Sequence, residues 1–148
     1  AEPARVWQST LMESRRCAID FRCVAPTSGQ MLPFLEAETA ELSTLTEFMY
    51  ADRHERNGLE YEVETVSLND LLRYHGAPQG FDYLSVDTEG SELGILMEFD
   101  FDYWRPKVVT VEHNFTSAKA QIEQLLDQNR YQQVLPQMSR WDSWFISV

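Results

Sequence analysis

Residues 81–96 read FDYLSVDTEGSELGIL, and this stretch decides the fold that the sequence predicts. Residues 81–87 alternate and are rich in strand-forming types, and Ser91 can cap a helix that begins directly after it. Residues 107–112, KVVTVE, form a β-branched run that is typical of a buried central strand. A strand, a helix and a second strand in this order predict two parallel neighbours joined by a crossover helix.

The elements on either side continue this alternation. Upstream, residues 60–66 alternate as a half-buried strand, and Ser67 can cap a short helix after it. Downstream, residues 117–129 place apolar side chains on one helix face, and residues 131–135 and 141–148 predict two final strands. The sequence therefore predicts an α/β sheet with crossover helices that ends in an antiparallel hairpin.

The N-terminal part of the chain has a weaker pattern. Residues 3–16 have apolar side chains at helical spacing, residues 17–25 alternate as a strand, and residues 31–35 predict another short strand. Residues 36–58 are rich in charge and only weakly periodic, so we interpret them as a variable excursion from the fold. Since no repeat, linker or shift of composition interrupts the chain, we expect one domain over residues 1–148.

The composition disfavours several classes of protein. Asp and Glu outnumber Lys and Arg by 24 to 12, and the resulting net charge of −12 disfavours binding to a nucleic-acid backbone. No run approaches the roughly 18 apolar residues that a membrane-spanning helix needs. The N-terminal residues AEPARVWQST lack a signal-peptide pattern, and Cys17 and Cys23 match no metal-ligand spacing. We therefore expect reduced thiols in a cytoplasmic protein.

Polar side chains follow both of the strands that decide the fold. Asp87 follows the first strand, and Glu112, His113 and Asn114 follow the second. Because ligands in open α/β sheets bind beyond the carboxyl ends of the strands, we expect these side chains to meet at one rim. Carboxylates, an imidazole and an amide in one place can hold a divalent ion or deprotonate a hydroxyl. Asp87, Glu112 and Asn114 are accordingly a candidate metal site.

Simpler interpretations stay open for some of these residues. Glu89 and Glu92 can complement the positive end of the helix that follows them. His113 can be a solvated histidine of a loop, where polar residues are common.

Three stretches together resemble a known family. DYLSVDTEGSELGIL, RPKVVTVEHN and the closing NRYQQVL…SRWDSWFI resemble the FkbM-type methyltransferases, which use S-adenosylmethionine. VETVSLNDLL looks like the helix that precedes the D-x-E-G strand, and AEPARVWQSTLMESRRCAIDFRCV looks like the end of the second strand, its helix and the third strand. The resemblance implies a Rossmann-like class I methyltransferase sheet.

The resemblance also implies roles for individual residues. Glu2 falls where such folds place the carboxylate that takes the cofactor's ribose hydroxyls, and Asp87 and Glu89 fall near the transferred methyl group. Glu112 and Asn114 would face the acceptor, and His113 would act with Asp87 as the catalytic pair. The implied reaction is in-line transfer of a methyl group to a hydroxyl of a small molecule or sugar, helped by a base or by a metal ion.

The sequence departs from the family pattern at its start. None of the six glycines forms the glycine-rich loop that follows the family's first strand, so we expect an incomplete sheet that lacks both. The first strand lies between the second and the fourth in this fold, and its absence leaves two unpaired strand edges. We therefore expect a homodimer in which these edges meet. The alternative to an enzyme is a non-catalytic remnant that acts as a self-associating binding domain.

Overall fold

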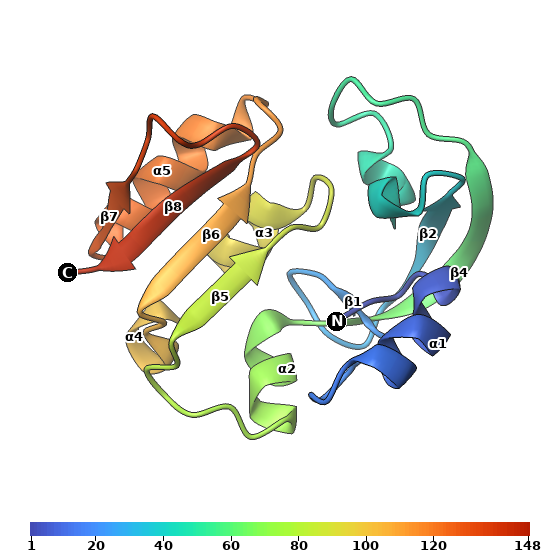
Figure 1. The fold of residues 1–148 in the computed structure, drawn as a ribbon, viewed down its shortest axis with the longest axis horizontal. Helices are drawn as coiled ribbons and strands as arrows, with labels where there is room; N and C mark the ends of the chain where they lie inside the picture. The colour runs from blue at the N-terminus through green and yellow to red at the C-terminus, as the bar shows by residue number, and fades with distance from the viewer.

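The computed structural model describes residues 1–148, and it contains two four-stranded mixed sheets (Figure 1). The first has the strand order β1-β4-β2-β3 and is formed by β1 (Cys23–Val24), β2 (Met31–Ala37), β3 (Thr44–Leu45) and β4 (Gly58–Val66). The second has the order β5-β6-β8-β7 and is formed by β5 (Tyr83–Val86), β6 (Val108–Glu112), β7 (Tyr131–Val134) and β8 (Asp142–Ser147).

Five α-helices and two short 3-10 helices connect the strands. They are α1 (Arg5–Ser14), η1 (Ala40–Leu42), η2 (Thr46–Phe48), α2 (Leu68–Tyr74), α3 (Glu92–Met97), α4 (Phe101–Trp104) and α5 (Ala118–Gln128). None of them is long and apolar enough to cross a lipid bilayer.

The second sheet has the predicted crossover arrangement. Strands β5 and β6 are parallel, with Val86 beside Val111, and α3 connects them through the segment that begins with DTEGSE. Strand β8 runs antiparallel to β6, and β7 runs antiparallel to β8. The prediction of an α/β sheet that ends in an antiparallel hairpin is therefore confirmed for residues 81–148. The predicted strand at residues 60–66 does not join this sheet, because β4 pairs with β1 and β2 in the first sheet.

The main core lies on the helical side of this sheet. Val109 and Val111 of β6 are completely buried, and they belong to one apolar cluster with Ile122 and Leu126 of α5 and Phe145 of β8. Each such side chain contributes about 1.5–3 kcal/mol when it is fully buried. The β-branched run at residues 108–111 is thus the buried central strand that the sequence predicted, because it has a neighbour on both sides.

A smaller core supports the first sheet. Ala4, Cys23, Phe34, Leu45 and Val63 form a separate buried cluster, which joins the start of α1 to the sheet. The alternation of residues 60–66 contributes to this packing, since β4 is antiparallel to β2 over residues 58–64 and turns the side chain of Val63 into the core. The predicted N-terminal helix and the predicted strands at residues 31–35 and 60–66 are confirmed.

The prediction of a strand over residues 17–25 is wrong for most of its length. Only Cys23–Val24 pair with another strand, parallel to β4. Asp20 instead accepts hydrogen bonds from the backbone and the guanidinium of Arg22, and it pairs with His75 at 3.0 Å. Side chains that bond to nearby backbone in this way compete with a strand ladder. Similarly, the 36–58 excursion is structured, because it holds β3, η1 and η2.

Strands β5 and β1 each lie at an edge of their sheet, and no strand joins the two sheets. The N-terminus of the chain lies between the two sheets (Figure 1). The edge of β5 is therefore available for pairing with another strand.

Candidate functional site

The parallel pairing of β5 and β6 brings their carboxyl ends together. Asp87 follows Val86 directly, and Glu112 follows Val111, the residue that pairs with Val86. Oxygen atoms of Asp87, Glu89 and Glu112 all lie within 4.8 Å of one another. The structure therefore places Asp87 and Glu112 at one rim, as the strand order predicted, with Glu89 as the third carboxylate.

The turn between β5 and α3 is held by a carboxylate inside it. Glu92 accepts hydrogen bonds from the backbone N–H of Thr88 at 2.8 Å and of Gly90 at 3.0 Å. Ser91 occupies the N-cap position, but its hydroxyl bonds to Thr88 rather than to a helix N–H, so the predicted Ser91 capping bond is wrong. Glu92 instead satisfies amides of the turn that precedes the helix, and as the first residue of α3 it also places a carboxylate at the positive helix end.

A buried arginine from the 36–58 excursion reaches the same turn. The guanidinium of Arg56 is completely shielded from solvent, and each of its five N–H groups has an acceptor. It donates to the carbonyl oxygens of Leu42 and Met49, twice to the carboxylate of Asp52, and to Glu89 at 2.7 Å. Arg56 therefore fixes the excursion to the D-x-E-G turn.

Two further contacts close the excursion over the turn. The hydroxyl of Thr44 donates to the carbonyl oxygen of Glu89 at 2.9 Å. Gly90 has φ 128°, and a Cβ placed on it would lie 2.9 Å from Cβ of Phe48, so only glycine fits there. Sequence reasoning missed Arg56 and these contacts, because residues 36–58 carry no periodic signal and the partners are distant along the chain.

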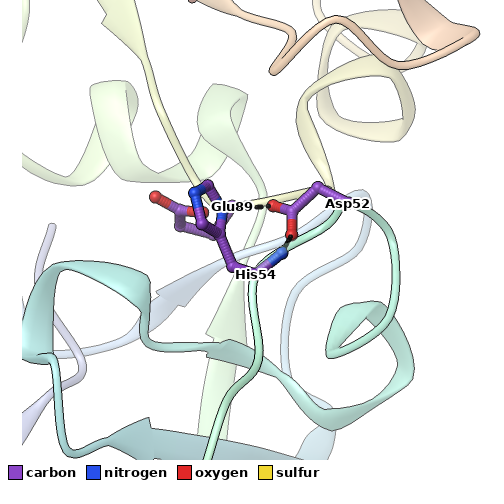
Figure 2. A group of neighbouring side chains, drawn as sticks. All are labelled: Asp52, His54 and Glu89. Atoms are coloured by element: carbon purple, nitrogen blue, oxygen red, sulfur yellow. Dashed lines mark hydrogen bonds and ion pairs between the residues drawn. The ribbon is translucent and has the colours of Figure 1, made fainter.

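Asp52, His54 and Glu89 form an apparent ligand cluster at this junction, which Figure 2 shows. Asp52 accepts a hydrogen bond from the backbone N–H of His54 at 2.8 Å, and its other oxygen lies 3.3 Å from Nδ1 of the ring. Arg56 already neutralises both carboxylates of the cluster. A cation there would be repelled by the guanidinium, so this group does not fit a metal ion.

The Asp87–Glu112 pair has no such counter-charge. Oxygen atoms of the two carboxyl groups lie within 4.8 Å of each other, and like charges this close disfavour the ionisation of both groups. Burial, followed by the charges of Asp87 and Glu89, raises the pKa of Glu112 to about 9. Burial also raises the pKa of Asp87 and of Glu89, although Arg56 opposes the shift at Glu89. The pair therefore holds one proton, mainly on Glu112, and one negative charge.

His113 is buried, with only 3% of its surface exposed, so its interpretation as a solvated loop residue is wrong. Its Nδ1 accepts a hydrogen bond from the backbone N–H of Phe115 at 3.1 Å. Burial lowers its pKa, so the ring is neutral at pH 7 and carries its hydrogen on Nε2. That Nε2 atom has no partner in the protein.

Backbone strain is concentrated in the two loops at this rim. Glu89, Asn114 and Phe115 have φ values of 57°, 43° and 56°, in the left-handed region that L-residues rarely adopt. Each such residue costs roughly 1–2 kcal/mol. Strain of this kind persists where the surrounding structure enforces it, and it is common at functional sites.

Two cavities lie on either side of the carboxyl pair. An apolar groove of about 430 Å³ is lined by Asp87 and by residues of α2 and β5, among them Leu68, Leu72 and Val86. A polar cavity of about 250 Å³ is lined by Glu112 and by residues from the β6 end, the D-x-E-G turn and the excursion: Asp52, Gly90, Glu92, His113 and Asn114. Because Asp87 lines one cavity and Glu112 the other, the carboxyl pair links them.

Glu2 lies apart from this rim. Its carboxylate accepts a hydrogen bond from the backbone N–H of Ala4 at 2.8 Å, and burial raises its pKa. Ala1 lines the apolar groove, but Glu2 does not. The structure thus brings together the predicted site residues of the β5 and β6 ends and leaves Glu2 outside them.

Comparison with known proteins assigns the chain to a family. The model of the methyltransferase FkbM domain matches residues 16–142. The chain belongs to the FkbM methyltransferase family. The FkbM match covers the D-x-E-G turn, Arg56 and the polar cavity, and it begins after Glu2. No curated protein and no solved structure matches the chain.

Proposed function

We propose that this domain is an S-adenosylmethionine-dependent methyltransferase that methylates a hydroxyl group of a small molecule or sugar. The observation that carries the proposal is the Asp87–Glu112 pair, which links an apolar groove to a polar cavity. A methyl donor and an acceptor need adjacent sites of different polarity, and membership of the FkbM family supplies the reaction class.

The apolar groove fits part of the cofactor. Its volume of about 430 Å³ lies within the roughly 300–1,000 Å³ of small-molecule sites, and its lining suits an aromatic base. Asp87 at the groove offers a carboxylate to a hydroxyl or to a positive charge, which suits the sulfonium of S-adenosylmethionine. When bound, that group supplies an electrophilic methyl. The ribose-binding role of Glu2 stays a prediction.

The acceptor hydroxyl would bind on the Glu112 side of the pair. The ionised carboxylate of the Asp87–Glu112 pair would accept the hydroxyl proton as the oxygen takes the methyl group, whose bonding electrons would stay with the sulfur. The negative charge of the carboxylate and the positive charge of the sulfonium would thus be lost together. We propose this pair as the base in place of His113, because Nδ1 of His113 already accepts a hydrogen bond and Nε2, which carries the ring hydrogen, has no free lone pair. Most of the rate enhancement would come from positioning the two reactants.

A divalent ion is an alternative partner for the same carboxylates. The oxygens of Asp87, Glu89 and Glu112 are close enough to share an ion, and the amide of Asn114 lies at the same cavity as Glu112. A rise in melting temperature with magnesium or calcium, lost in Glu112→Gln, would support a metal-assisted reaction. An unchanged melting temperature contradicts it.

A second copy of this chain is the partner that we propose for the open edge of β5. The strand pairs with β6 alone, and four of its side chains line the apolar groove beside the free edge: Tyr83, Leu84, Ser85 and Val86. An added strand would satisfy the free backbone groups there. Light scattering at micromolar concentration tests this homodimer, and a monomeric mass contradicts it.

The state of the two cysteines supports a cytoplasmic location. Cys17 is exposed and Cys23 is buried, and neither forms a disulfide. Burial raises the pKa of the Cys23 thiol to about 12, so it stays protonated. Free thiols of this kind are typical of reducing compartments.

Calorimetric titration with S-adenosylmethionine tests the proposed activity. We expect saturable binding that weakens about tenfold in Asp87→Asn, since the substitution removes the charge that faces the groove. Glu13→Gln removes one exposed carboxylate of α1 and serves as the control that should bind normally. Glu2→Ala tests the predicted ribose contact in the same experiment.

Absence of binding at millimolar cofactor would contradict the enzyme and favour the non-catalytic, self-associating alternative. Binding followed by methyl transfer to a hydroxyl acceptor would establish the activity.

A further inference from the structure

The polar cavity is lined by acidic side chains and by no basic ones. Asp52, Glu92 and Glu112 line it, and no lysine or arginine does. The nearest guanidinium, that of Arg56, is completely buried and uses every N–H on protein acceptors. The lining therefore offers carboxyl groups to a ligand, and no donor with a full positive charge faces it.

Two buried polar atoms of the cavity residues have no partner in the protein. Oε2 of Glu112 is an acceptor, and Nε2 of the nearly fully buried His113 is a donor. Leaving such atoms unpaired costs about 1–3 kcal/mol each, so native sites supply them with a partner. A ligand that bears both a hydrogen-bond acceptor and a cationic or hydroxyl donor satisfies them together.

We propose that the polar cavity binds a hydroxylated amine, with its ammonium group against the carboxylates and a hydroxyl oxygen accepting from His113. The inference rests on the proposed function in one respect, because it takes this cavity as the place of the methyl acceptor. It adds the chemical class of that acceptor: a small polyol with an ammonium group, and without phosphate, sulfate or carboxylate.

Electrostatics separates these classes of ligand. Repulsion by neighbouring carboxylates contributes to the raised pKa of Glu112. An ammonium ion would reduce this repulsion, a neutral sugar would leave it unchanged, and an anion would increase it. The volume of about 250 Å³ lies below the usual range of drug-sized sites, which favours a single sugar ring over a chain of rings.

Three sugars that differ in one group test the proposal: glucosamine, glucose and glucose 6-phosphate. Each is titrated into the protein at about pH 6.5, where an amine of this kind is protonated. We expect glucosamine to bind about tenfold or more tightly than glucose, and glucose 6-phosphate to bind most weakly. In NMR spectra, glucosamine should shift the backbone signals of Gly90 and Asn114, which line the cavity.

Variants of the two unpartnered residues separate their roles. Glu112→Gln should reduce the preference for glucosamine over glucose to about threefold or less, because a bound ammonium ion favours the ionised form of Glu112 and a glutamine cannot ionise. His113→Phe should weaken both sugars to a similar extent. Glu13→Gln removes a carboxylate that lies outside the cavity, so it should keep the preference and exclude an effect of overall charge.

Equal affinity for glucosamine and glucose, tighter binding of the phosphate, or no binding of any of the three would overturn the proposal. Binding of S-adenosylmethionine is measured in the same samples. If the cofactor binds and the amine preference is absent, only the acceptor class is wrong; if neither binds, the proposed function fails as well.

Discussion

Arg56 and Glu89 form an ion pair at 2.7 Å in which the guanidinium is fully buried and the carboxylate is nearly so. The pair joins the 36–58 excursion to the D-x-E-G turn. Taking both charges out of water is expensive, and the geometry repays it only because all five N–H groups of Arg56 have acceptors. The excursion therefore holds a fixed position, and its residues form one wall of the polar cavity.

Arg56→Met should destabilise the protein by about 3–5 kcal/mol, because it leaves Asp52 and Glu89 buried without a counter-charge. Urea denaturation at neutral pH measures this change in the free energy of unfolding. The double variant Arg56→Met/Glu89→Gln should recover part of the loss, since one of the uncompensated charges is removed.

Arg73→Met is the matched control for this prediction. Arg73 pairs with Asp70 across an exposed helix surface, where both side chains are about half exposed, at 54% and 52%. An exposed ion pair of this kind contributes little to the free energy of unfolding, so its loss should leave the urea midpoint unchanged. Similar losses in the two methionine variants would contradict the role assigned to Arg56.

Gly90→Ala should destabilise the protein by about 2–4 kcal/mol, because the new methyl group would overlap Phe48 and the backbone would be strained. Gly29→Ala is the control, since Gly29 also has a positive φ, of 77°, but nothing lies within 4 Å of its Cβ position. Its expected loss is about 1 kcal/mol. The difference in thermal stability measures the contact of the excursion with the turn, and equal losses would contradict that contact.

The parts of the fold that could be predicted depend on patterns within a few residues. The run at residues 108–111 identifies a buried central strand, and parallel pairing with the preceding strand places Asp87 beside Glu112. The cap at Ser67 was equally local, because its hydroxyl accepts from the backbone N–H of Asp70, three residues away. Such features can be predicted without knowing which distant residues contact them.

The parts that could not be predicted depend on contacts far apart along the chain. Arg56 is one of several charged residues in a segment without periodicity, and its burial follows from Leu42, Met49 and Glu89 surrounding it. The expected strand over residues 17–25 had the right alternation, but Asp20 bonds to Arg22 and His75, and the pairing begins only at Cys23. An alternating pattern alone does not indicate that a side chain will bond elsewhere and compete with strand pairing.

Ser67→Ala should cost about 1 kcal/mol through the loss of the N-cap of α2, whose leucines line the apolar groove. Ser9→Ala, an exposed position within α1, is the control and should change stability by less than about 0.5 kcal/mol. Chemical denaturation of both variants measures the effect. A loss no larger at Ser67 than at Ser9 would show that the cap contributes nothing.

Glu112→Gln should make the protein more stable at alkaline pH. The pKa of Glu112 is about 9 in the folded protein, above its ordinary value of 4.5, so the folded state keeps a proton that the unfolded state has released between these values. The free energy of unfolding therefore falls as the pH rises through this window, and levels off above about 9. A glutamine has no proton to lose, so the variant should lack most of this slope.

Thermal denaturation between about pH 7 and 9 isolates this effect. The pKa of His113 is lowered from 6.5, and those of Asp20 and Asp52 are lowered from 3.8, so these groups are already in their final states there. The Cys23 thiol, with a pKa of about 12, has not yet begun to ionise. We expect Glu112→Gln to exceed the wild type by about 1–3 kcal/mol at the upper end of the range. Parallel curves for the two proteins, as expected for the control Glu13→Gln, would show that Glu112 is already ionised in the fold and that the carboxyl pair shares no proton.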